Sequence, residues 1–573
     1  MKKVVLCLFC ILGFSVLSFS QEGYIFPIKE SRELSSIFAD HRKFHFHSGI
    51  DFRTGEKTGL EVYAAKSGWV YRLFASWWGY GKAVYLKHPD GQLTLYAHLS
   101  DFSEKLKKIV TEEQLRNKRY RADIFPEDTI RIEEGELIGY SGETGTGEPH
   151  FHFEIRDEKN RPLNPLTSRL SIPDTIPPVF TSIGIMPLDV NSYVDDSMDI
   201  KIYSLHFDST QQVYISTKIP IVEGNIGIEI SAYDQMAEKG SRFGVYKLEL
   251  SLDSLLVFST HYDTIDFENS WKIELDRDFG LLKKKEGEFY KLYLDYGNDL
   301  PLYHSINRGF LGFPDSGLHQ LLISAYDASG NFSRSKLVLK TIHPRVYEAL
   351  KTENPRLFMT TNQDKIIKQS ENDLARVEID SGSVFKKINL LVMKLDIPRM
   401  ARQRSSFYSF LPSDIPLAKP AKITLRCTGS KCRLAKTGLY EFLDSTYKFT
   451  GQEIDTLNNS ISGEVRDLST YVLLEDRKAP EIRGLYPKPG QEINVKELII
   501  SARVTDDLSG IGNDQDIEVY LDGEWQIPEY DPEKLILISK PLKVLSPGWH
   551  KLVVKARDRM RNTRVFKSRF KII

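Results

Sequence analysis

The sequence predicts a mainly β protein made of several domains. Short runs rich in β-branched and aromatic residues, bounded by turn residues, recur along most of the 573 residues. In "KAVYLKHPDGQLTLYAHLS" (82–100), Asp90-Gly91 separates two such runs as a hairpin turn does. A chain of this length exceeds a single hydrophobic core, so the usual size of domains predicts about three to five folded units.

Composition indicates an ordinary globular protein. Hydrophobic residues make up 41% of the chain and charged residues 27%, which gives no reason to expect extensive disorder. Lys plus Arg number 77 against 78 for Asp plus Glu, and no long run of one charge occurs. Because nucleic-acid binding needs a concentration of positive charge, we expect no nucleic-acid partner.

The first twenty residues differ from the rest of the chain. Lys2 and Lys3 precede an apolar run that ends in Ser18-Phe19-Ser20. This pattern predicts a signal peptide over residues 1–20 with a small-x-small cleavage site; the alternative is an uncleaved membrane anchor. No later run reaches about 18 apolar residues, so we expect the mature chain to be exported to the periplasm or cell envelope, or secreted, without a stable membrane span.

Two cysteines remain after the predicted signal peptide, Cys427 and Cys432 in "RCTGSKCR". In an oxidising compartment this spacing favours a disulfide across a tight hairpin. Free thiols are the alternative. A metal site would need two further ligands nearby, and the surrounding sequence offers none.

An internal repeat occurs in the C-terminal half. "GLHQLLISAYDASGN" (317–331) aligns without gaps on "GWHKLVVKARDRMRN" (548–562), and "DTIPPVF" from Asp174 matches "DRKAPEI" from Asp476. The repeat predicts two related β-sandwich modules that resemble immunoglobulin-like folds, over 173–343 and 476–573. Its two histidines, His319 and His550, occupy equivalent positions and are therefore expected to be structural.

Three further segments complete the predicted organisation. A domain is expected over 21–172 and a β-rich middle module, which carries the cysteine pair, over 344–475. A helix is predicted over 104–120, with apolar residues Leu106, Ile109, Val110 and Leu115 among charged ones. This helix could cap a cleft or be a surface decoration.

The stretch "HFHFEIR" (150–156) carries polar chemistry on a strand. In an extended chain His150, His152 and Glu154 share one face, while the apolar residues between them share the other. Seven of the thirteen histidines fall between positions 41 and 152, which indicates one site in this domain.

Three pieces of the N-terminal sequence could build a catalytic zinc site. They are "HFHSGIDF" (45–52), "TLYAHLS" (94–100) and the histidine strand. Catalytic zinc takes three protein ligands and keeps a fourth position for water, a count that His47, Asp51 and one of the two strand histidines satisfy. The remaining strand histidine and His98 would then move protons and stabilise the tetrahedral intermediate.

These pieces occur together with "GYGKAVYLKH" (79–88), "EEGELIGYSGETGTGEPH" (133–150) and Asn164-Pro165-Leu166. Over residues 24–170 the chain resembles the lysostaphin/LytM-type metalloendopeptidases, family twenty-three of the metallopeptidases, which cut peptide bonds in bacterial cell-wall peptidoglycan. The resemblance implies an antiparallel β-sheet peptidase domain with Zn²⁺ as cofactor. It further implies metal ligands at His47, Asp51 and His152 and catalytic histidines at His98 and His150.

The chain departs from the pattern of this family in two places. About 30 residues, including the predicted helix, separate the His98 segment from "GELIGYSG". The loop "GETGTGEP" (142–149) lacks the Ser-Gly-Pro tripeptide that is frequent in this family, although its glycines would permit close backbone approach to a peptide. A further acidic loop, "TDDLSGIGNDQD" (505–516), fits no defined calcium loop and is expected to be a solvated turn.

The predicted function is an exported zinc endopeptidase that hydrolyses peptidoglycan cross-links or stem peptides, with peptidoglycan as its partner. The β-modules would position it on the wall or contact a protein of the cell envelope. The alternative is a non-catalytic wall-binding or hydrolase-activating scaffold of the same fold. The wall attacked could belong to the producing cell or to a competitor.

Overall fold

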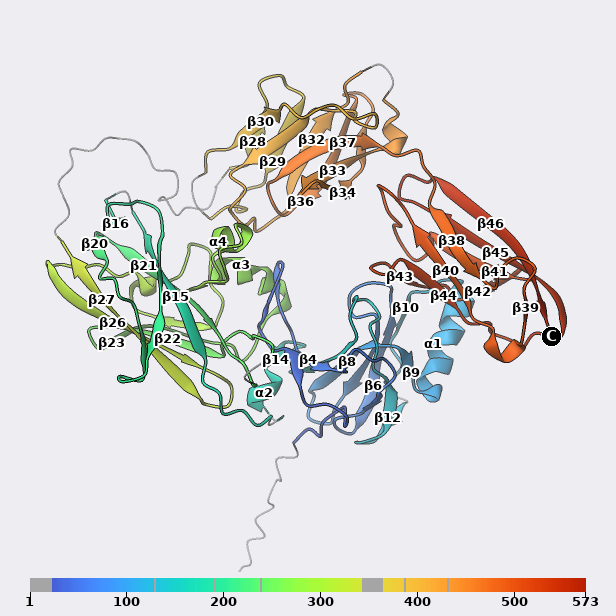
Figure 1. Cartoon of the computed structure of the whole chain (residues 1–573), viewed down its shortest axis with the longest axis horizontal. Coiled ribbons are helices and arrows are strands. Elements are labelled where there is room, and N and C mark those ends of the chain that lie inside the picture. The colour runs from blue at the N-terminus through green and yellow to red at the C-terminus, as the bar shows by residue number, and fades with distance from the viewer. Residues whose placement is uncertain are drawn as a thin grey trace, which may run out of the picture.

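The structure is a computed structural model and describes residues 23–127, 130–168, 170, 172–189, 191–237, 240–342, 364–385, 388–429 and 432–573. The predicted signal peptide lies outside the described residues. The prediction of a mainly β protein is confirmed, because nearly all regular structure is strand and most strand pairs are antiparallel (Figure 1). Within the described residues, no helix is both long and apolar enough to cross a membrane.

The N-terminal domain runs from β1 to α2. Its elements are β1 (Leu34–Ser36), β2 (His41–Arg42), β3 (His45–Phe46), β4 (Ile50–Arg53), β5 (Glu61–Tyr63), β6 (Gly68–Ala75), β7 (Lys82–Lys87), β8 (Leu93–Leu99), β9 (Asp101–Phe102), α1 (Glu104–Asn117), β10 (Ala122–Ile124), β11 (Arg131–Ile132), β12 (Leu137–Tyr140), β13 (His150–Arg156), β14 (Pro162–Leu163) and α2 (Pro165–Ser168).

One large sheet dominates this domain. Its strands follow the order β1-β4-β13-β8-β7-β6-β10, and a smaller sheet has the order β5-β12-β9. The alternation of residues along β13 places Phe151, Phe153 and Ile155 in the hydrophobic core, where each is completely buried. The opposite face of the same strand is therefore left for polar side chains.

The first β-module contains two sheets, with orders β17-β15-β21-β24 and β16-β20-β27-β26-β22-β23-β25; β18 and β19 pair beside the second. Its elements are β15 (Val179–Pro187), β16 (Tyr193–Val194), β17 (Lys201–Ser204), β18 (His206–Asp208), β19 (Val213–Ile215), β20 (Ile221–Glu223), β21 (Ile226–Tyr233), β22 (Lys247–Leu252), β23 (Leu255–His261), η1 (Phe267–Lys272), α3 (Ile273–Asp276), α4 (Phe279–Lys283), β24 (Tyr290–Lys291), β25 (Tyr303–Ser305), η2 (Asn307–Gly309), β26 (Gly317–Tyr326) and β27 (Phe332–Thr341).

The middle β-module also contains two sheets, with orders β28-β29-β32-β36-β35 and β30-β31-β37-β33-β34. Its elements are β28 (Ile366–Gln369), β29 (Ala375–Ile379), β30 (Leu391–Leu395), β31 (Phe407–Leu411), β32 (Ala421–Arg426), η3 (Leu434–Lys436), β33 (Thr437–Leu443), β34 (Thr446–Gly451), β35 (Glu453–Asp455), β36 (Ser460–Val465) and β37 (Thr470–Glu475).

The C-terminal β-module is built from sheets of order β38-β40-β44-β43 and β39-β46-β45-β41-β42. Its elements are β38 (Glu481–Tyr486), β39 (Glu492–Ile493), η4 (Val495–Glu497), β40 (Ile500–Thr505), β41 (Ile517–Leu521), β42 (Glu524–Gln526), β43 (Glu529–Asp531), β44 (Ile536–Ser539), β45 (Gly548–Arg557) and β46 (Thr563–Ile572). The domain limits drawn from the sequence stay a prediction.

The two repeat segments form matching hairpins. β26 and β27 pair over ten residues each, as do β45 and β46. His319 lies 2.6 Å from a carboxylate oxygen of Asp253, and His550 lies 2.6 Å from that of Asp522. Each histidine thus braces a turn in its own module, as their equivalent positions predicted.

The disulfide joins Cys427 and Cys432, as predicted. The prediction of a tight hairpin is wrong, because the strand before the bridge, β32, and the strand after it, β33, belong to different sheets. The bridge therefore closes a crossover between the two sheets of the middle module.

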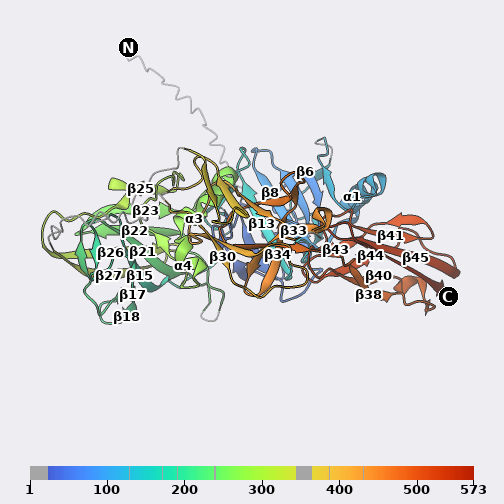
Figure 2. The same ribbon diagram turned by 90° about the horizontal axis from the view of Figure 1, so that it is seen from above.

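The chain closes on itself as a ring. In Figure 1 the first, middle and C-terminal β-modules follow one another around the picture, and the last returns to the N-terminal domain beside α1. Figure 2 places the first and C-terminal modules at opposite ends of the molecule. The indole Nε1 of Trp77 donates to the carbonyl oxygen of Pro528 at 3.1 Å, and Arg119 pairs with Asp514 at 2.9 Å. These contacts close the ring.

The predicted helix forms but ends at Asn117, three residues early, where Lys118 adopts a left-handed conformation. Leu106 and Val110 are buried, whereas Leu115 is 38% exposed, so the apolar stripe is narrower than expected. α1 contacts β6 and β10, at the end of the large sheet away from β4 and β13, and also β9 of the smaller sheet. Its apolar face belongs to the domain core, and whether the helix limits access to the site stays a prediction.

Candidate metal centre

The histidine strand β13 lies between β4 and β8 in the large sheet. Its register places His152 opposite Asp51 of β4 on one side and opposite Ala97 of β8 on the other. Directly opposed residues project from the same face, so His152 and Asp51 meet above the sheet. His98 follows Ala97, and the segment that carries His47 precedes β4.

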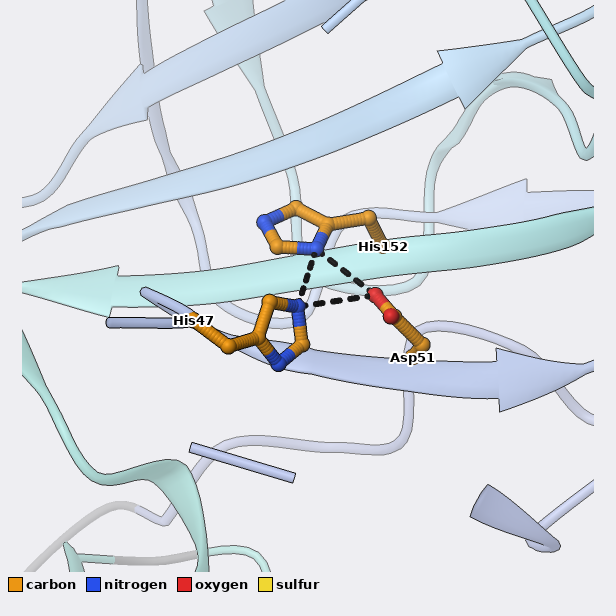
Figure 3. A group of neighbouring side chains, drawn as sticks. All are labelled: His47, Asp51 and His152. Atoms are coloured by element: carbon orange, nitrogen blue, oxygen red, sulfur yellow. Dashed lines mark hydrogen bonds and ion pairs between the residues drawn. The ribbon is translucent and has the colours of Figure 1, made fainter. Parts of the chain in front are cut away.

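Three side chains converge at this point (Figure 3). His47 Nε2 lies 3.1 Å from His152 Nδ1 and 3.1 Å from Asp51 Oδ1, and His152 Nδ1 lies 2.7 Å from the same carboxylate oxygen. All three residues are at least 94% buried. The structure thus brings together the three residues predicted as metal ligands, while their role as ligands stays a prediction.

The remaining nitrogen of each histidine ring has a partner that sets the tautomer. Nδ1 of His47 donates to the carbonyl oxygen of Ile37 at 2.7 Å, and Nε2 of His152 lies 2.9 Å from Glu154 Oε1. A proton on each of these nitrogens leaves the lone pairs of His47 Nε2 and His152 Nδ1 facing the cluster. Such outer hydrogen bonds orient the histidine ligands of metal ions in proteins.

The electrostatics of the cluster favour a positive charge at its centre. Burial alone would raise the pKa of Asp51, but His47 and His152 outweigh it and hold the pKa well below the usual range of a carboxyl. Burial alone would lower the pKa of His152, but Asp51 and Glu154 outweigh it and raise the pKa to about 9. The two carboxylates around His152 thus favour positive charge at this point of the site.

Glu154 is the centre of a second layer around the site. It is completely buried and accepts hydrogen bonds from Ser48 Oγ at 2.7 Å, Tyr80 OH at 2.6 Å and Arg156 Nε at 2.6 Å, in addition to facing His152. The guanidinium of Arg156 is the main favourable influence that keeps the pKa of Glu154 low against the effect of burial. Glu154 therefore both orients His152 and forms a salt bridge with Arg156.

His98 and His150 lie beside the cluster with their ring centroids 4.6 Å apart. Nδ1 of His98 donates to the carbonyl oxygen of Thr144 at 2.9 Å, and Nδ1 of His150 donates to that of Glu148 at 2.9 Å. Both Nε2 atoms can therefore accept a proton. Nε2 of His150 lies 3.8 Å from Asp51 Oδ1.

Burial favours the neutral form of both of these histidines. Burial, followed by the nearby His150 and His152, lowers the pKa of His98 to about 3, and burial also lowers the pKa of His150. The backbone of His98 has a φ of 57°, a left-handed conformation that is strained for a residue with a side chain. Such strain is retained where the surrounding structure needs the side chain in one place.

Glycines allow close packing around the site. A Cβ on Gly49 would lie 2.3 Å from the backbone oxygen of Phe153, so the turn between the first two ligands can approach β13 only with glycine. Gly145, at a φ of 78°, packs in the same way against the backbone of Gly79 and Gly81. The glycines of loop 142–149 thus bring two loops of the domain together, a use that the sequence did not indicate.

Two further histidines near the motif do not join the cluster. Nε2 of His41 lies 3.4 Å from a carboxylate oxygen of Glu274 in the first β-module, and His45 is exposed with Nδ1 against the carbonyl oxygen of Lys43. Nothing in the sequence indicates Tyr80, which belongs to a distant segment. Arg156 was not predicted either, although it continues the alternation of His152 and Glu154 along β13 and thus shares their face.

The donor set suits zinc. Two imidazole nitrogens and one carboxylate oxygen are zinc ligands of catalytic sites, and about 2.1 Å bonds in a tetrahedron would set them about 3.4 Å apart. The observed separations of 2.7 to 3.1 Å are slightly shorter. Small outward movements of the side chains would accommodate the ion.

The comparison with protein families agrees with this geometry. Residues 45–115 match the family model described as Peptidase family M23. The chain carries a peptidase M23 domain. The resemblance predicted from the motifs is thus confirmed. The matched segment contains His47, Asp51 and His98, while the histidine strand lies beyond it.

Curated relatives are similar to part of the chain. The DD-carboxypeptidase/endopeptidase Mpg of Neisseria meningitidis serogroup B is 35% identical over 133 residues, which cover 23% of this chain and 24% of the relative. An uncharacterized metalloprotease of Haemophilus influenzae is 30% identical over 153 residues, 25% of this chain and 27% of the relative. The similarity thus spans about a quarter of the length of these relatives.

A similar solved structure is that of a zinc containing peptidase from Vibrio cholerae. It is 25% identical, with a TM-score of 0.20, and the alignment covers 26% of this chain and 41% of that chain.

Proposed function

We propose that the chain is a zinc-dependent endopeptidase that hydrolyses peptide bonds of bacterial cell-wall peptidoglycan, in its cross-links or stem peptides. The observation that carries the proposal is the cluster of His47, Asp51 and His152, in which one nitrogen of each histidine and a carboxylate oxygen converge. The peptidase M23 domain and the endopeptidase name of the Neisseria relative support it.

The residues of the site would divide the reaction between them. His47, Asp51 and His152 would hold zinc, which lowers the pKa of a bound water and polarises the carbonyl of the scissile peptide bond. His98 and His150 each present an unprotonated Nε2 to the site, so one of them can take a proton from the attacking water. The other, once protonated, can donate a hydrogen bond to the oxygen of the tetrahedral intermediate. Glu154 holds His152 in the tautomer that leaves Nδ1 for the metal.

The sequence supports a proposal for where the reaction takes place. We propose export to the periplasm or cell envelope, or secretion, directed by residues 1–20. The three β-modules would then position the peptidase domain on the wall or against a protein of the envelope.

Digestion of purified peptidoglycan tests the proposal. The full chain, loaded with zinc, should release soluble fragments and create new amino termini, and mass spectrometry of the fragments identifies the bond that is cut. A chelator should stop the release, and zinc should restore it. His47→Ala should be inactive, whereas His45→Ala, two residues away and exposed, should retain full activity.

One outcome would support the alternative function. Zinc-loaded protein that sediments with peptidoglycan but creates no new amino termini would indicate a scaffold. Protein that takes up no zinc at all would contradict the metal centre itself.

A further inference from the structure

Each of the two related β-modules contains three aspartates whose carboxylates converge. In each group, one oxygen from every aspartate lies within 4.8 Å of the others. The groups are Asp174, Asp234 and Asp327 in the first module and Asp476, Asp506 and Asp558 in the C-terminal module. They contain no histidine, unlike the metal centre of the peptidase domain.

The aspartates occupy equivalent places in the two modules. The first of each group precedes the first strand, β15 or β38. The second directly follows the strand that pairs with it, β21 or β40, and the third directly follows the long repeat strand, β26 or β45. The loops between these positions differ in length, so the same arrangement is built by two different sequences.

The hydrogen bonds around the third aspartate also match. The backbone N–H of Asn331 donates to Asp327 at 2.8 Å, and that of Asn562 donates to Asp558 at 2.8 Å. The side-chain amide of Asn331 also donates to the backbone oxygen of Asp174 at 3.1 Å, and Asn562 makes the equivalent bond at 3.2 Å. Each asparagine thus ties two of the three segments together and fixes the position of the carboxylates.

Several carboxylate oxygens in these groups are buried without a partner. Asp234 is only 2% exposed, and its Oδ1 has no hydrogen-bond partner. Asp174 Oδ2 and Asp506 Oδ1 are also buried oxygens without a hydrogen-bond partner. Buried carboxylates that face one another without a cation are costly, so the arrangement calls for a positive charge.

We infer that each group of three aspartates binds one calcium ion. Calcium takes six to eight oxygen ligands from carboxylates, carbonyls and water and tolerates irregular geometry. Zinc would favour imidazole or thiolate ligands, which these groups lack, and magnesium requires a near-ideal octahedron. The unpartnered oxygens are therefore assigned to calcium.

The location of the two groups indicates what the ions would do. The first group lines a cavity of about 470 Å³ together with Ile37, Leu166 and Leu170 of the N-terminal domain. Asp476 directly follows β37 of the middle module, and the Nζ of Lys436 donates to Asn562 Oδ1 beside the second group. Each ion would thus stiffen the junction between a repeat module and the domain before it.

Calcium binding to the full chain tests the inference. Zinc-saturated protein, freed of other metals, is dialysed against calcium up to about 5 mM, which covers the weak range of extracellular calcium modules. Wild type should bind two ions, Asp234→Asn and Asp506→Asn one each, and the double variant none. Asp507→Asn is the matched control and should bind two, because Asp507 pairs with Arg402 and Lys478 instead.

Thermal unfolding gives a second measurement that does not depend on activity. Calcium should raise the melting temperature of wild type by several degrees, and magnesium at the same concentration should do so less. The double variant should unfold at the same temperature with and without calcium.

Two results would overturn the inference. Wild type that binds no calcium while Asp234→Asn is more stable would show that the carboxylates merely share a proton. Equal binding by wild type and the double variant would place the ions elsewhere. If a variant does not fold, terbium luminescence of wild type, displaced by calcium, decides whether the ion binds.

Discussion

The two related β-modules contact the peptidase domain on opposite sides of the metal centre. On the first side, the backbone N–H of Gly244 donates to Asp40 Oδ1 at 2.7 Å, and Asp40 Oδ2 accepts from the backbone N–H of Ile37 at 2.8 Å. The carbonyl of Ile37 in turn accepts the Nδ1 proton of His47. The first module therefore supports His47, one of the three proposed metal ligands.

The C-terminal module supports the other side. Lys534 forms an ion pair with Glu143, and the next residue, Thr144, holds Nδ1 of His98 through its carbonyl oxygen. Trp77, 2% exposed, packs against Tyr530 and Tyr120 and belongs to the hydrophobic core of the C-terminal module. Two related modules thus support different parts of the candidate site, His47 on one side and His98 on the other.

The largest effects are expected inside the site itself. There, the proposed zinc ligands lie toward the first module and the proposed proton-transferring histidine His98 lies toward the C-terminal module. His47→Ala and Asp51→Ala should lose zinc and all activity, because two ligands cannot hold the ion. His98→Ala and His150→Ala should keep zinc and lose about 10²- to 10⁴-fold in turnover, the usual contribution of general acid–base groups. Zinc per chain and cleavage of a soluble muropeptide measure the two properties. If His150→Ala lost zinc while His152→Ala kept it, the assignment of ligands would be reversed.

The next effect concerns the side of the first module. Asp40→Asn should weaken zinc binding about 10- to 100-fold, the usual cost of changing an outer partner of a metal ligand, because it disturbs the carbonyl that orients His47. Turnover with saturating zinc should remain close to that of wild type. Competition with a zinc chelator gives the affinity. Asp90→Asn, a change in an exposed pair with Lys66, is the control; equal affinities of the two variants would contradict the support assigned to the first module.

The side of the C-terminal module should show the opposite pattern. Trp77→Ala removes the aromatic anchor of the docked module, so the loop that holds His98 should become less well placed. We expect turnover to fall about tenfold, which corresponds to about 1.4 kcal/mol, with zinc affinity unchanged. Trp78→Ala is the matched control, since the neighbouring Trp78 is 38% exposed. A loss of zinc in Trp77→Ala would show that the two sides are not independent.

The features predicted from the sequence depend on short spacings. His150, His152 and Glu154 alternate along one strand, so the strand period alone places them on one face. Asp51 follows His47 by only four residues, so the local backbone sets the distance between the two side chains. By contrast, Tyr80, Asp40 and the docking of Trp77 depend on contacts between distant segments, and no spacing in the sequence indicates them.

The inserted helix and the aspartate groups show the same limit. The period of 104–120 predicts a helix and its apolar side, but which surface covers that side is decided by the whole fold. Asp327 and Asp558 are visible in the repeat, yet Asp234 and Asp506 reach the same places through loops of different length. No loop motif in the sequence identifies Asp234 and Asp506 as members of these groups. The loop "TDDLSGIGNDQD" is therefore predicted from the sequence to be a solvated turn.

The smallest effect is expected from the middle module, which lies between the two repeat modules in the chain. Replacing Cys427 and Cys432 by serine should leave zinc content and turnover unchanged, since the bridge lies in the middle module, whose sheets contain no strand of the N-terminal domain. The loop is short, so the bridge should stabilise the module by about 2 kcal/mol, the low end for disulfides. Thermal unfolding and muropeptide cleavage of the double-serine protein measure both quantities. A fall in turnover with zinc still bound would mean that a change in the middle module reaches the site through the two repeat modules. The contacts of those two modules with the N-terminal domain would then not be independent of each other.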